Sequence, residues 1–257
     1  MAYPRRGTEV QVAGGFADRA PAARVTAMTE PVIAVRDLHK TYGSGSSAFE
    51  ALRGVDLDVA DGESLAVVGK SGSGKSTLMH LIALLDRPTS GTIHLDGVET
   101  SRLSKRELNL TRNRAFGFVF QQFFLNPAMS VLDNVTLPLS IAGVGGRERQ
   151  QRGMAALEQL GLADKAGNRA TDLSGGQKQR VVISRALINR PRVIFADEPT
   201  GNLDTATGGQ VEDILFDLNR RQGITLVVVT HDPDLAARCD RQLLVVDGRI
   251  DAGQVAA

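Results

Sequence analysis

Alternation of apolar and polar residues predicts strands near the start of the chain. The segments VIAV and ALRGVDLDV alternate in this way, with Val55, Leu57 and Val59 at every second position. The continuous apolar run SLAVVG favours a central strand that is covered on both faces. A glycine-rich loop, a helix over KSTLMHLIALL and a strand over GTIHLDGV follow, and the last strand ends in a turn at Asp96 and Gly97.

The middle of the chain has mostly helical spacing. The residues SKRE at 104–107 match a capping box, which marks the start of a helix. The strand-like run FGFVFQ and the segment SVLDNVTLPL come next, and RERQQRGMAALEQLG then carries Met154, Leu157 and Leu160 on one face before the stop signal Gly161. We therefore expect a helical subdomain inserted between about residues 90 and 185.

The last part of the chain returns to alternating strands and helices. The largely apolar runs VIFAD and LVVVTH are typical of parallel strands. Between them EDILFDLNRRQG predicts an amphipathic helix that ends at Gly223, and QLLVVDGRI predicts a final hairpin. The pattern indicates an α/β domain over about residues 31–250, with a core built from both ends of the chain. We expect residues 1–30 to form a flexible tail and residues 251–257 a short C-terminal tail.

Composition excludes several classes of protein. The chain has 257 residues, 42% of them hydrophobic, which is ample for a packed core. Its net charge of +1 gives no overall signal of nucleic-acid binding. No apolar run approaches the roughly 20 residues of a membrane helix, and the first thirty residues lack the apolar region of a signal peptide. The single cysteine, Cys239, is expected to be a small, partly buried hydrophobe.

The loop GKSGSGKST carries a strong chemical signal. It matches G-x-x-x-x-G-K-[ST] between a predicted strand and a predicted helix, the context that a phosphate-binding loop requires. Its N–H groups would surround a phosphate, Lys75 would reach the phosphate oxygens and Ser76 would hold Mg²⁺. An ordinary glycine turn is the alternative. The predicted binding residues are Gly69, Lys70, Ser71, Gly72, Ser73, Gly74, Lys75, Ser76 and Thr77.

A second candidate anion site lies far along the chain, in DLSGGQKQR. Ser174, Gly175 and Gly176 come directly before a predicted helix, so they would present a hydroxyl and bare N–H groups at its positive end. One chain therefore carries two candidate phosphate cradles.

The segment VIFADEPT offers two carboxylates at the end of a predicted strand. Asp197 would bind Mg²⁺ beside the phosphates, and Glu198 would polarise an attacking water. Open α/β sheets bind ligands at this end of their strands. Taken alone, the same pair also fits a solvated strand edge.

Four single residues point to the same chemistry more weakly. Gln121 follows a predicted strand and would contact Mg²⁺ or water, although a surface role is the ordinary alternative. His231 ends a core strand, where a structural histidine is common. Asp204 would pass for a turn residue, and Tyr42 either stacks on a base or packs in a loop.

These motifs occur in the order and spacing of the ABC-type ATPase domain, which the chain resembles over about residues 31–250. The resemblance rests on Tyr42, GKSGSGKST, Gln121, LSGGQ, VIFADE, GNLD and His231. It implies an α/β fold with a P-loop NTPase core, whose sheet is mixed and mostly parallel, together with an antiparallel β part and an inserted helical subdomain. It also implies ATP and Mg²⁺ as cofactors, with Ser76, Gln121 and Asp197 at the metal.

The resemblance further implies a role for each weaker residue. Tyr42 would stack on adenine, and Gln121 would link the nucleotide to the transport partner. Glu198 would act as the general base, and His231 would sense the γ-phosphate.

The same resemblance accounts for two cradles in one chain. In the family, two domains pair head-to-tail, so that Ser174, Gly175, Gly176 and Gln177 would cover the ATP of a second copy. Two half-sites that are too far apart to share one nucleotide are both completed in such an isologous dimer. Asp204 would lie at the seam.

Within the family, GFVFQQF, ADEPTGNLD and VTLPL resemble the lipoprotein-release, macrolide-efflux and cell-division group. The resemblance implies a peripheral subunit on the cytoplasmic face of the cell membrane that drives separate integral-membrane permease subunits. Lys178 and the segment FFLNPAM, residues 123–129, depart from the group's usual pattern. A cell-division regulator and a DNA-associated ATPase are the alternatives, although no nucleic-acid partner is expected, because sustained heptads are absent.

Overall fold

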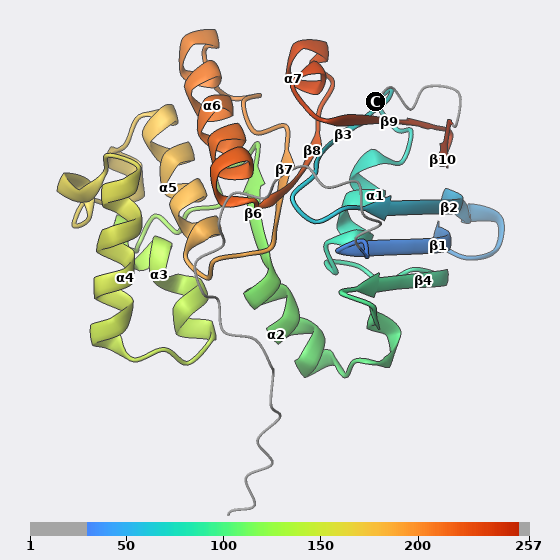
Figure 1. Ribbon diagram of the computed structural model, residues 1–257, viewed down its shortest axis with the longest axis horizontal. Helices are drawn as coiled ribbons and strands as arrows, with labels where there is room; N and C mark the ends of the chain where they lie inside the picture. Colours follow the sequence, from blue (N-terminus) through green and yellow to red (C-terminus); the bar gives the residue numbers. More distant parts are fainter. Residues whose placement is uncertain (1–29, 252–257) are drawn as a thin grey trace, which may run out of the picture.

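The computed structural model describes residues 30–251 and consists of two sheets and a set of helices (Figure 1). The antiparallel sheet with α1 lies on one side of the molecule, and helices α3 to α6 lie on the other, with strands β6 to β8 between them (Figure 1). No helix within the described range is long and apolar enough to cross a membrane.

The smaller sheet is antiparallel and has the strand order β2-β1-β4-β5. In β2 the buried residues Val55, Leu57 and Val59 alternate with exposed aspartates, as the sequence predicts for a half-buried strand. The strands are β1 (Ile33–Tyr42), β2 (Phe49–Val59), β4 (Ser90–Leu95) and β5 (Val98–Glu99).

The larger sheet has the order β10-β9-β3-β8-β7-β6, and all its neighbouring strands are parallel except the pair β9 and β10. Its central strands are apolar along their length because helices or the other sheet cover both faces. The strands are β3 (Ser64–Val68), β6 (Phe116–Phe120), β7 (Val193–Asp197), β8 (Thr225–Val229), β9 (Arg241–Val246) and β10 (Arg249–Ile250).

Most helices begin at the capping residues that the sequence offers. Ser104 forms the predicted capping box with Glu107, and Gly223 ends α6 with a φ of +66°. The α-helices are α1 (Lys75–Ile82), α2 (Lys105–Ala115), α3 (Val131–Ile141), α4 (Gly146–Gln159), α5 (Gly175–Leu187), α6 (Thr205–Gln222) and α7 (Pro233–Ala237). Short 3-10 turns occur at Gly45–Ser47, Thr100–Arg102, Ala163–Lys165 and Ala170–Asp172.

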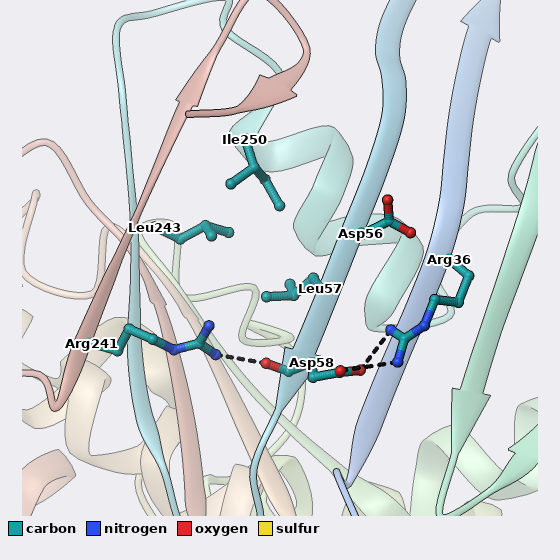
Figure 2. A pocket seen from close by; sticks show the side chains of 7 residues that line it. All are labelled: Arg36, Asp56, Leu57, Asp58, Arg241, Leu243 and Ile250. Atoms are coloured by element: carbon teal, nitrogen blue, oxygen red, sulfur yellow. Dashed lines mark hydrogen bonds and ion pairs between the residues drawn. The ribbon is translucent and has the colours of Figure 1, made fainter. Parts of the chain in front are cut away.

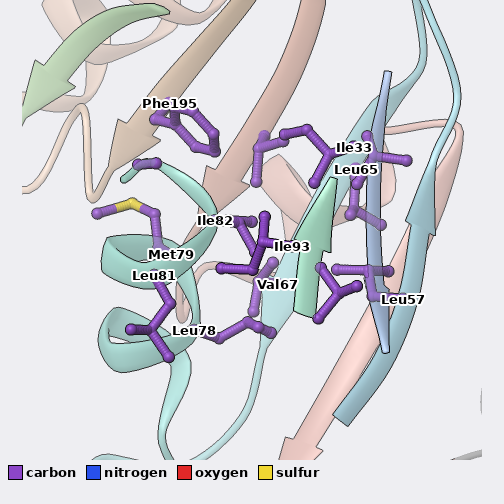
Figure 3. Close-up of a cluster of buried hydrophobic side chains, with 14 of the residues drawn as sticks. Ile33, Leu57, Leu65, Val67, Leu78, Met79, Leu81, Ile82, Ile93 and Phe195 are labelled. Carbon is purple, nitrogen blue, oxygen red and sulfur yellow. The ribbon is translucent and has the colours of Figure 1, made fainter. Parts of the chain in front are cut away.

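Helix α1 is the centre of the main core (Figure 3). Its buried side chains, Leu78, Met79, Leu81 and Ile82, pack between residues of the antiparallel sheet and residues of β3 and β7. Burial of each such side chain contributes about 1.5–3 kcal/mol to folding. The helix ends before the apolar run does, because Leu84 adopts a φ of +56°. The packing fixes the direction in which α1 leaves the phosphate loop.

The remaining helices form a smaller core of their own. Val135 and Leu139 of α3 pack with Leu157 of α4 and Val181 of α5. The range 90–185 also contains β4 and β6, which pair with β1 and β7 in the two sheets. The division into subdomains therefore stays a prediction, and the predicted tails lie outside the described residues apart from Glu30 and Asp251.

The α/β class with mixed sheets and an antiparallel part is confirmed. Cys239 is partly buried against an apolar cluster, and burial raises the pKa of its thiol to about 12. A thiol with this pKa is protonated at neutral pH, as expected of a structural cysteine.

Candidate nucleotide-binding site

The loop of residues 69–77 joins β3 to α1 and is packed so closely that glycine is required. A Cβ atom on Gly69, where φ is +147°, would lie 2.3 Å from the carbonyl oxygen of Val245. A Cβ on Gly74, where φ is +109°, would lie 2.7 Å from the carbonyl oxygen of Ala51. The loop is thus held between β2 and β9, with its shape set by neighbouring backbone.

Lys75 lies inside this loop. Its Nζ donates to the carbonyl oxygens of Gly69 at 2.8 Å and Lys70 at 2.9 Å, and the N–H of Ser73 donates to Lys70 at 3.2 Å. Ser76 is exposed in the first turn of α1, at the positive end of that helix. The loop therefore gathers an ammonium, backbone N–H groups and a hydroxyl at one helix N-terminus, which suits a phosphate.

Glu198 and His231 form a contact at the ends of two parallel strands. Glu198 follows β7, and its Oε1 lies 2.7 Å from His231 Nδ1 and accepts the His231 N–H at 3.0 Å. Thr230 donates to Glu198 Oε2 at 3.4 Å. The backbone of Glu198 has a φ of +45°, and its N–H donates to Val229 at 2.9 Å. These bonds fix the orientation of the Glu198 carboxylate at the edge of the sheet. The positive φ of Glu198 makes this backbone conformation strained.

Electrostatics link this edge to the phosphate loop. Burial raises the pKa of Asp197, against the opposing effects of nearby His80 and Lys75. The hydrogen bond and the charge of Glu198 raise the pKa of His231, and Lys75 lowers it slightly. Because β3, β8 and β7 are neighbouring parallel strands, the loop after β3 and the residues at the ends of β7 and β8 lie at one edge of the sheet and belong to one site.

Gln121 is tied to the loop that follows Glu198. Its carbonyl oxygen accepts from Asn202 Nδ2 at 2.8 Å, and its Nε2 lies 3.5 Å from Asn202 Oδ1. Its side chain also lies against Gly201, where a Cβ would come within 2.8 Å of Gln121 Nε2. The structure thus joins Gln121 to the acidic pair through the residues GN at 201–202.

The LSGGQ segment forms the N-terminus of α5. Ser174 Oγ accepts the N–H of Gln177 at 3.3 Å, and Gln177 Oε1 accepts the N–H of Ser174 at 2.9 Å. The first intrahelical bond runs from Lys178 to the carbonyl of Ser174, so the N–H groups of Gly175 and Gly176 precede it. These groups point out of the helix end, as an anion site needs.

Asp204 caps the next helix, α6, beside the LSGGQ segment. Its Oδ1 accepts the N–H of Thr207 at 3.0 Å, and its hydrogen bonds with Thr207 lower the pKa of Asp204. A Cβ on Gly176 would lie 2.3 Å from the Thr207 methyl carbon. Asp204 and LSGGQ are therefore neighbours in the same chain.

The predicted site residues fall into two groups. Loop 69–77 lies with Asp197, Glu198 and His231, whereas 174–177 lies with Asp204. Figure 1 shows α1 and α5 well apart, with strands β6 to β8 between them. No hydrogen bond or ion pair between side chains joins the two groups within the described part of the chain. Tyr42 ends β1 and is 40% exposed, with its hydroxyl bonded to Asp86 at 3.1 Å.

The sequence reasoning missed Gln179, a residue that connects these parts. It is fully buried in α5, and its Nε2 donates to the carbonyl oxygens of Pro199 at 2.6 Å and Phe120 at 3.5 Å. One bond reaches the segment after Glu198, and the other reaches the residue before Gln121. The signal was its spacing of three and four residues from the buried Val182 and Ile183, which places an amide on an apolar face.

Two cavities lie outside these groups. One of about 410 Å³ lies between β2 and β9, where Arg36 binds Asp58 at 2.7 Å and Arg241 binds the Asp58 carbonyl at 2.6 Å (Figure 2). Its arginines are thus already engaged. The other, of about 450 Å³, lies between α2, β6, α3 and α5, and the exposed Leu137 and Ile141 line it.

Comparison with known proteins agrees with this geometry. The chain matches the sequence profile of the ABC transporter family over residues 52–201. It is 48% identical over 219 residues to YknY of Bacillus subtilis, an uncharacterized ABC transporter ATP-binding protein, covering 85% of this chain and 95% of YknY. It is 45% identical to the lipoprotein-releasing system ATP-binding protein LolD of Syntrophus aciditrophicus, over 85% and 98% of the two chains.

Two further relatives extend the comparison. The macrolide export ATP-binding/permease protein MacB of Paracoccus denitrificans is 48% identical over 86% of this chain but only 33% of its own length. A dimeric structure of the ATP-binding cassette MJ0796, in a post-hydrolysis state with ADP and Pi, superposes with a TM-score of 0.79 at 40% identity, over 87% of this chain and 98% of that one. The chain belongs to the ABC transporter ATP-binding family, whose members bind and hydrolyse ATP.

Proposed function

We propose that this protein is the ATPase subunit of an ABC transporter that drives a separate membrane permease of the lipoprotein-release or macrolide/peptide-efflux type. The observation that carries the proposal is that loop 69–77, Asp197 and His231 lie at the same edge of the neighbouring parallel strands β3, β7 and β8. The similarity to LolD and MacB supports the choice of transporter type. The subunit would act at the cytoplasmic face of the cell membrane.

Loop 69–77 would bind the phosphates of ATP, with Lys75 turning from its own loop carbonyls to the phosphate oxygens. The hydroxyl of Ser76, the carboxylate of Asp197 and the amide oxygen of Gln121 are the oxygen ligands that Mg²⁺ prefers, so this set fits the ion. Asp197 is half-buried, and no lysine, arginine or histidine of residues 30–251 forms an ion pair with it. When bound, Mg²⁺ would neutralise charge on the phosphates.

Glu198 would accept a proton from the attacking water, as the general base. In the structure the ring of His231 engages its Oε1, whereas Thr230 lies 3.4 Å from its Oε2, so a turn of the His231 ring would make both carboxylate oxygens accessible to water. The γ-phosphate of ATP would draw the protonated imidazole of His231 to itself. This exchange of partners would couple the presence of the γ-phosphate to the release of the base.

The LSGGQ segment would complete the site of a second copy of the chain. Ser174, Gly175, Gly176 and Gln177 lie in the group that is separate from loop 69–77, and the MJ0796 cassette has been solved as a dimer. A head-to-tail pair would bring each segment over the partner's ATP, with Asp204 at the seam. Closure with ATP and opening after hydrolysis would then move the permease.

The cavity beside β6 is the proposed docking site of the permease. β6 ends at Phe120, directly before Gln121. A permease segment bound in this cavity would therefore contact the strand that positions Gln121 beside the nucleotide. Its lining combines phenylalanines of β6 and the 63% exposed Ile141 with asparagines and arginines of α2 and α5, and Phe124 packs nearby against the lining residue Phe120 at 5.6 Å. A short amphipathic helix of the permease fits such a groove.

A cell-division-type ATPase that regulates an extracytoplasmic partner is the second candidate, since it would use the same subunit and the same groove. A DNA-associated ATPase is less favoured by the net charge of +1. Salt-sensitive binding to DNA separates the last class from the others, because phosphate contacts make such binding weaken steeply with salt.

The test is recovery of the partner with Glu198→Gln and ATP from detergent-solubilised membranes. Loss of the base should slow hydrolysis by about 10²–10⁴-fold and hold the closed dimer. Recovery of a permease with Glu198→Gln but not with Lys75→Ala supports the proposal. Ile141→Asp should reduce that recovery, whereas Val246→Asp, at another exposed apolar residue, should not. Normal turnover in Glu198→Gln, or recovery of DNA in place of a permease, would contradict it.

A further inference from the structure

The ring of Tyr42 is held by polar contacts at the end of β1. Its hydroxyl donates to Asp86 Oδ2 at 3.1 Å. Lys40 Nζ lies 2.8 Å from the same carboxylate oxygen and 4.8 Å from the centre of the Tyr42 ring. Lys40 is held in turn by the carbonyl oxygen of Arg87 at 2.7 Å. The ring is thus fixed at its hydroxyl and covered by a cation on one face.

The rest of the ring is accessible to a ligand. Tyr42 remains 40% exposed although its hydroxyl and one face are engaged. An aromatic ring with a cation against one face offers the other to a flat ligand, and nucleic-acid bases stack on such faces. The arrangement suits a purine base on the face opposite Lys40.

Asp86 also ties the ring to the helix of the phosphate loop. The N–H groups of Leu85 and Asp86 both donate to the carbonyl oxygen of His80, at 2.8 and 3.2 Å. Asp86 Oδ1 accepts the N–H of Arg87 at 2.7 Å. Asp86 follows the end of α1 by four residues, and these bonds to His80 tie it to the helix that begins at Lys75 in the phosphate loop.

We propose that Asp86 and Lys40 are positioning residues that hold the Tyr42 ring at a set place relative to the phosphate loop, so that one nucleotide spans both. The inference rests on the proposed function, in which Tyr42 stacks on adenine. Neither residue touches the nucleotide. They fix the ring in its binding orientation before the nucleotide arrives. Binding then costs less side-chain conformational entropy, and the affinity for the nucleotide is higher.

The ionisation of Asp86 agrees with this role. Burial opposes its charge, but hydrogen bonds from Lys40, from the Arg87 N–H and from Tyr42 outweigh burial and lower the pKa of Asp86. The carboxylate is therefore an acceptor throughout the neutral range.

Tyrosine emission tests the positioning directly. The chain has no tryptophan and two tyrosines, so Tyr3→Phe leaves Tyr42 as the only emitter. In that background Asp86→Ala should lower the fluorescence anisotropy of Tyr42 in the absence of nucleotide. Asp58→Ala is the matched control, because Asp58 binds Arg36 of the same strand at 2.7 Å but is not in contact with Tyr42. It should leave the anisotropy unchanged.

Calorimetric binding tests the consequence. Asp86→Ala and Tyr42→Phe should each raise the Kd for ATP by about three- to tenfold, the effect of one lost hydrogen bond. The double variant should be no worse than either single one, because both remove the same contact. Inorganic tripolyphosphate, which has no base, should bind all variants equally.

The possible failures are distinguishable. An unaltered chain that does not bind ATP overturns the proposed function and this inference with it. Normal ATP binding together with an Asp86→Ala variant of unchanged anisotropy and Kd overturns this inference alone. An equal loss of ATP and tripolyphosphate binding in Asp86→Ala also overturns it, because Asp86 would then support the phosphate loop and not the ring.

Discussion

The phosphate loop and the LSGGQ segment both lie at helix N-termini, but they differ in how closely the rest of the chain packs around them. Loop 69–77 is held between β2 and β9 by close backbone contacts at Gly69 and Gly74, and Lys75 is bonded to two of its carbonyl oxygens. The LSGGQ segment is a helix start whose N-cap, Ser174, is exposed and exchanges hydrogen bonds with Gln177 of the same helix. Loop 69–77 can contact a phosphate from several sides within one chain, whereas the LSGGQ segment can contact it from one side only.

Because of this difference, substitutions in the two half-sites should have different effects on ATP binding. A loop that adds a lysine to the N–H groups of a helix N-terminus supplies affinity by itself, whereas the N–H groups of one helix end at the surface bind an anion weakly in water. The LSGGQ segment therefore needs a nucleotide already held by another surface. In the proposed dimer, the partner's loop 69–77 supplies it.

Substitution of one residue in each half-site tests whether the phosphate loop supplies ATP affinity and the LSGGQ segment supplies turnover. Lys75→Ala should abolish ATP binding to the isolated chain and lower turnover by about 10²–10³-fold. Ser174→Arg should lower turnover as much, because the bulky side chain blocks closure, but it should leave ATP binding to the monomer intact. Calorimetry and phosphate release measure the two effects.

Mixing these two variants tests the pairing itself. Random mixing should restore about a quarter of the sites, because half of the dimers are mixed and each has one intact site of two. A mixture of Lys75→Ala with Glu198→Gln is the control, since both lesions affect the same half-site and no mixed dimer has an intact one. A rescue no greater than in this control would argue against head-to-tail pairing.

A second variant separates packing from binding at LSGGQ. Gly176→Ala would put a methyl group 2.3 Å from the methyl carbon of Thr207, so it should destabilise the fold by about 1–3 kcal/mol. Thr207→Ser removes that carbon and should restore the melting temperature. If stability returns but turnover does not, Gly176 has a role beyond packing.

Gly175→Ala is the matched control, because its Cβ would lie 3.3 Å from the nearest atom, a side-chain carbon of Leu203. It should lower the melting temperature less. An equal loss in both glycine variants would contradict the packing argument.

A smaller effect is expected at Gln179, which connects the two regions. Gln179→Leu removes the bonds to Pro199 and Phe120 but also removes a side-chain oxygen that is buried without a partner in the described chain. The two changes partly offset, so the stability loss measured by denaturant unfolding should be about 0.5–1.5 kcal/mol. Gln177→Leu, at the partly exposed helix cap, should cost less; a larger loss there would argue against the buried link.

Local pattern predicted most of the fold. The apolar runs gave β3, β7 and β8, the capping box gave α2, and Gly223 gave the end of α6. The strand, loop and helix around residues 69–77 were also predictable, because they are consecutive and their geometry is local; the phosphate-binding roles of the loop residues stay a prediction. These features depend on neighbours in sequence.

What escaped prediction depends on contacts between distant segments. No local pattern states that β4 joins β1 across the phosphate-loop helix, or that Asn202 holds Gln121. The contact between Glu198 and His231 joins two strand ends that lie 33 positions apart. Such contacts arise from the order of strands in the sheet, which local alternation does not encode.

The contact between His231 and Glu198 gives the last and smallest prediction. Because the hydrogen bond and charge of Glu198 raise the pKa of His231, the imidazole should titrate above its ordinary value of about 6.5. The ion pair is therefore fully present below that pH and is lost as the pH rises through the raised pKa. Glu198→Gln should return the His231 pKa, followed by NMR of its ring protons, towards the ordinary value.

His39 provides the internal control for this titration. Hydrogen bonds from its ring to Glu50 and Asp37 raise its pKa by the same kind of contact, in the antiparallel sheet, which does not contain Glu198. Glu198→Gln should shift His231 and leave His39 in place. If the pKa values of both histidines change, the cause is a general change in the electrostatic field or in the fold. If neither moves, His231 is not paired with Glu198 in solution, and the proposed exchange of partners at the γ-phosphate has no starting state.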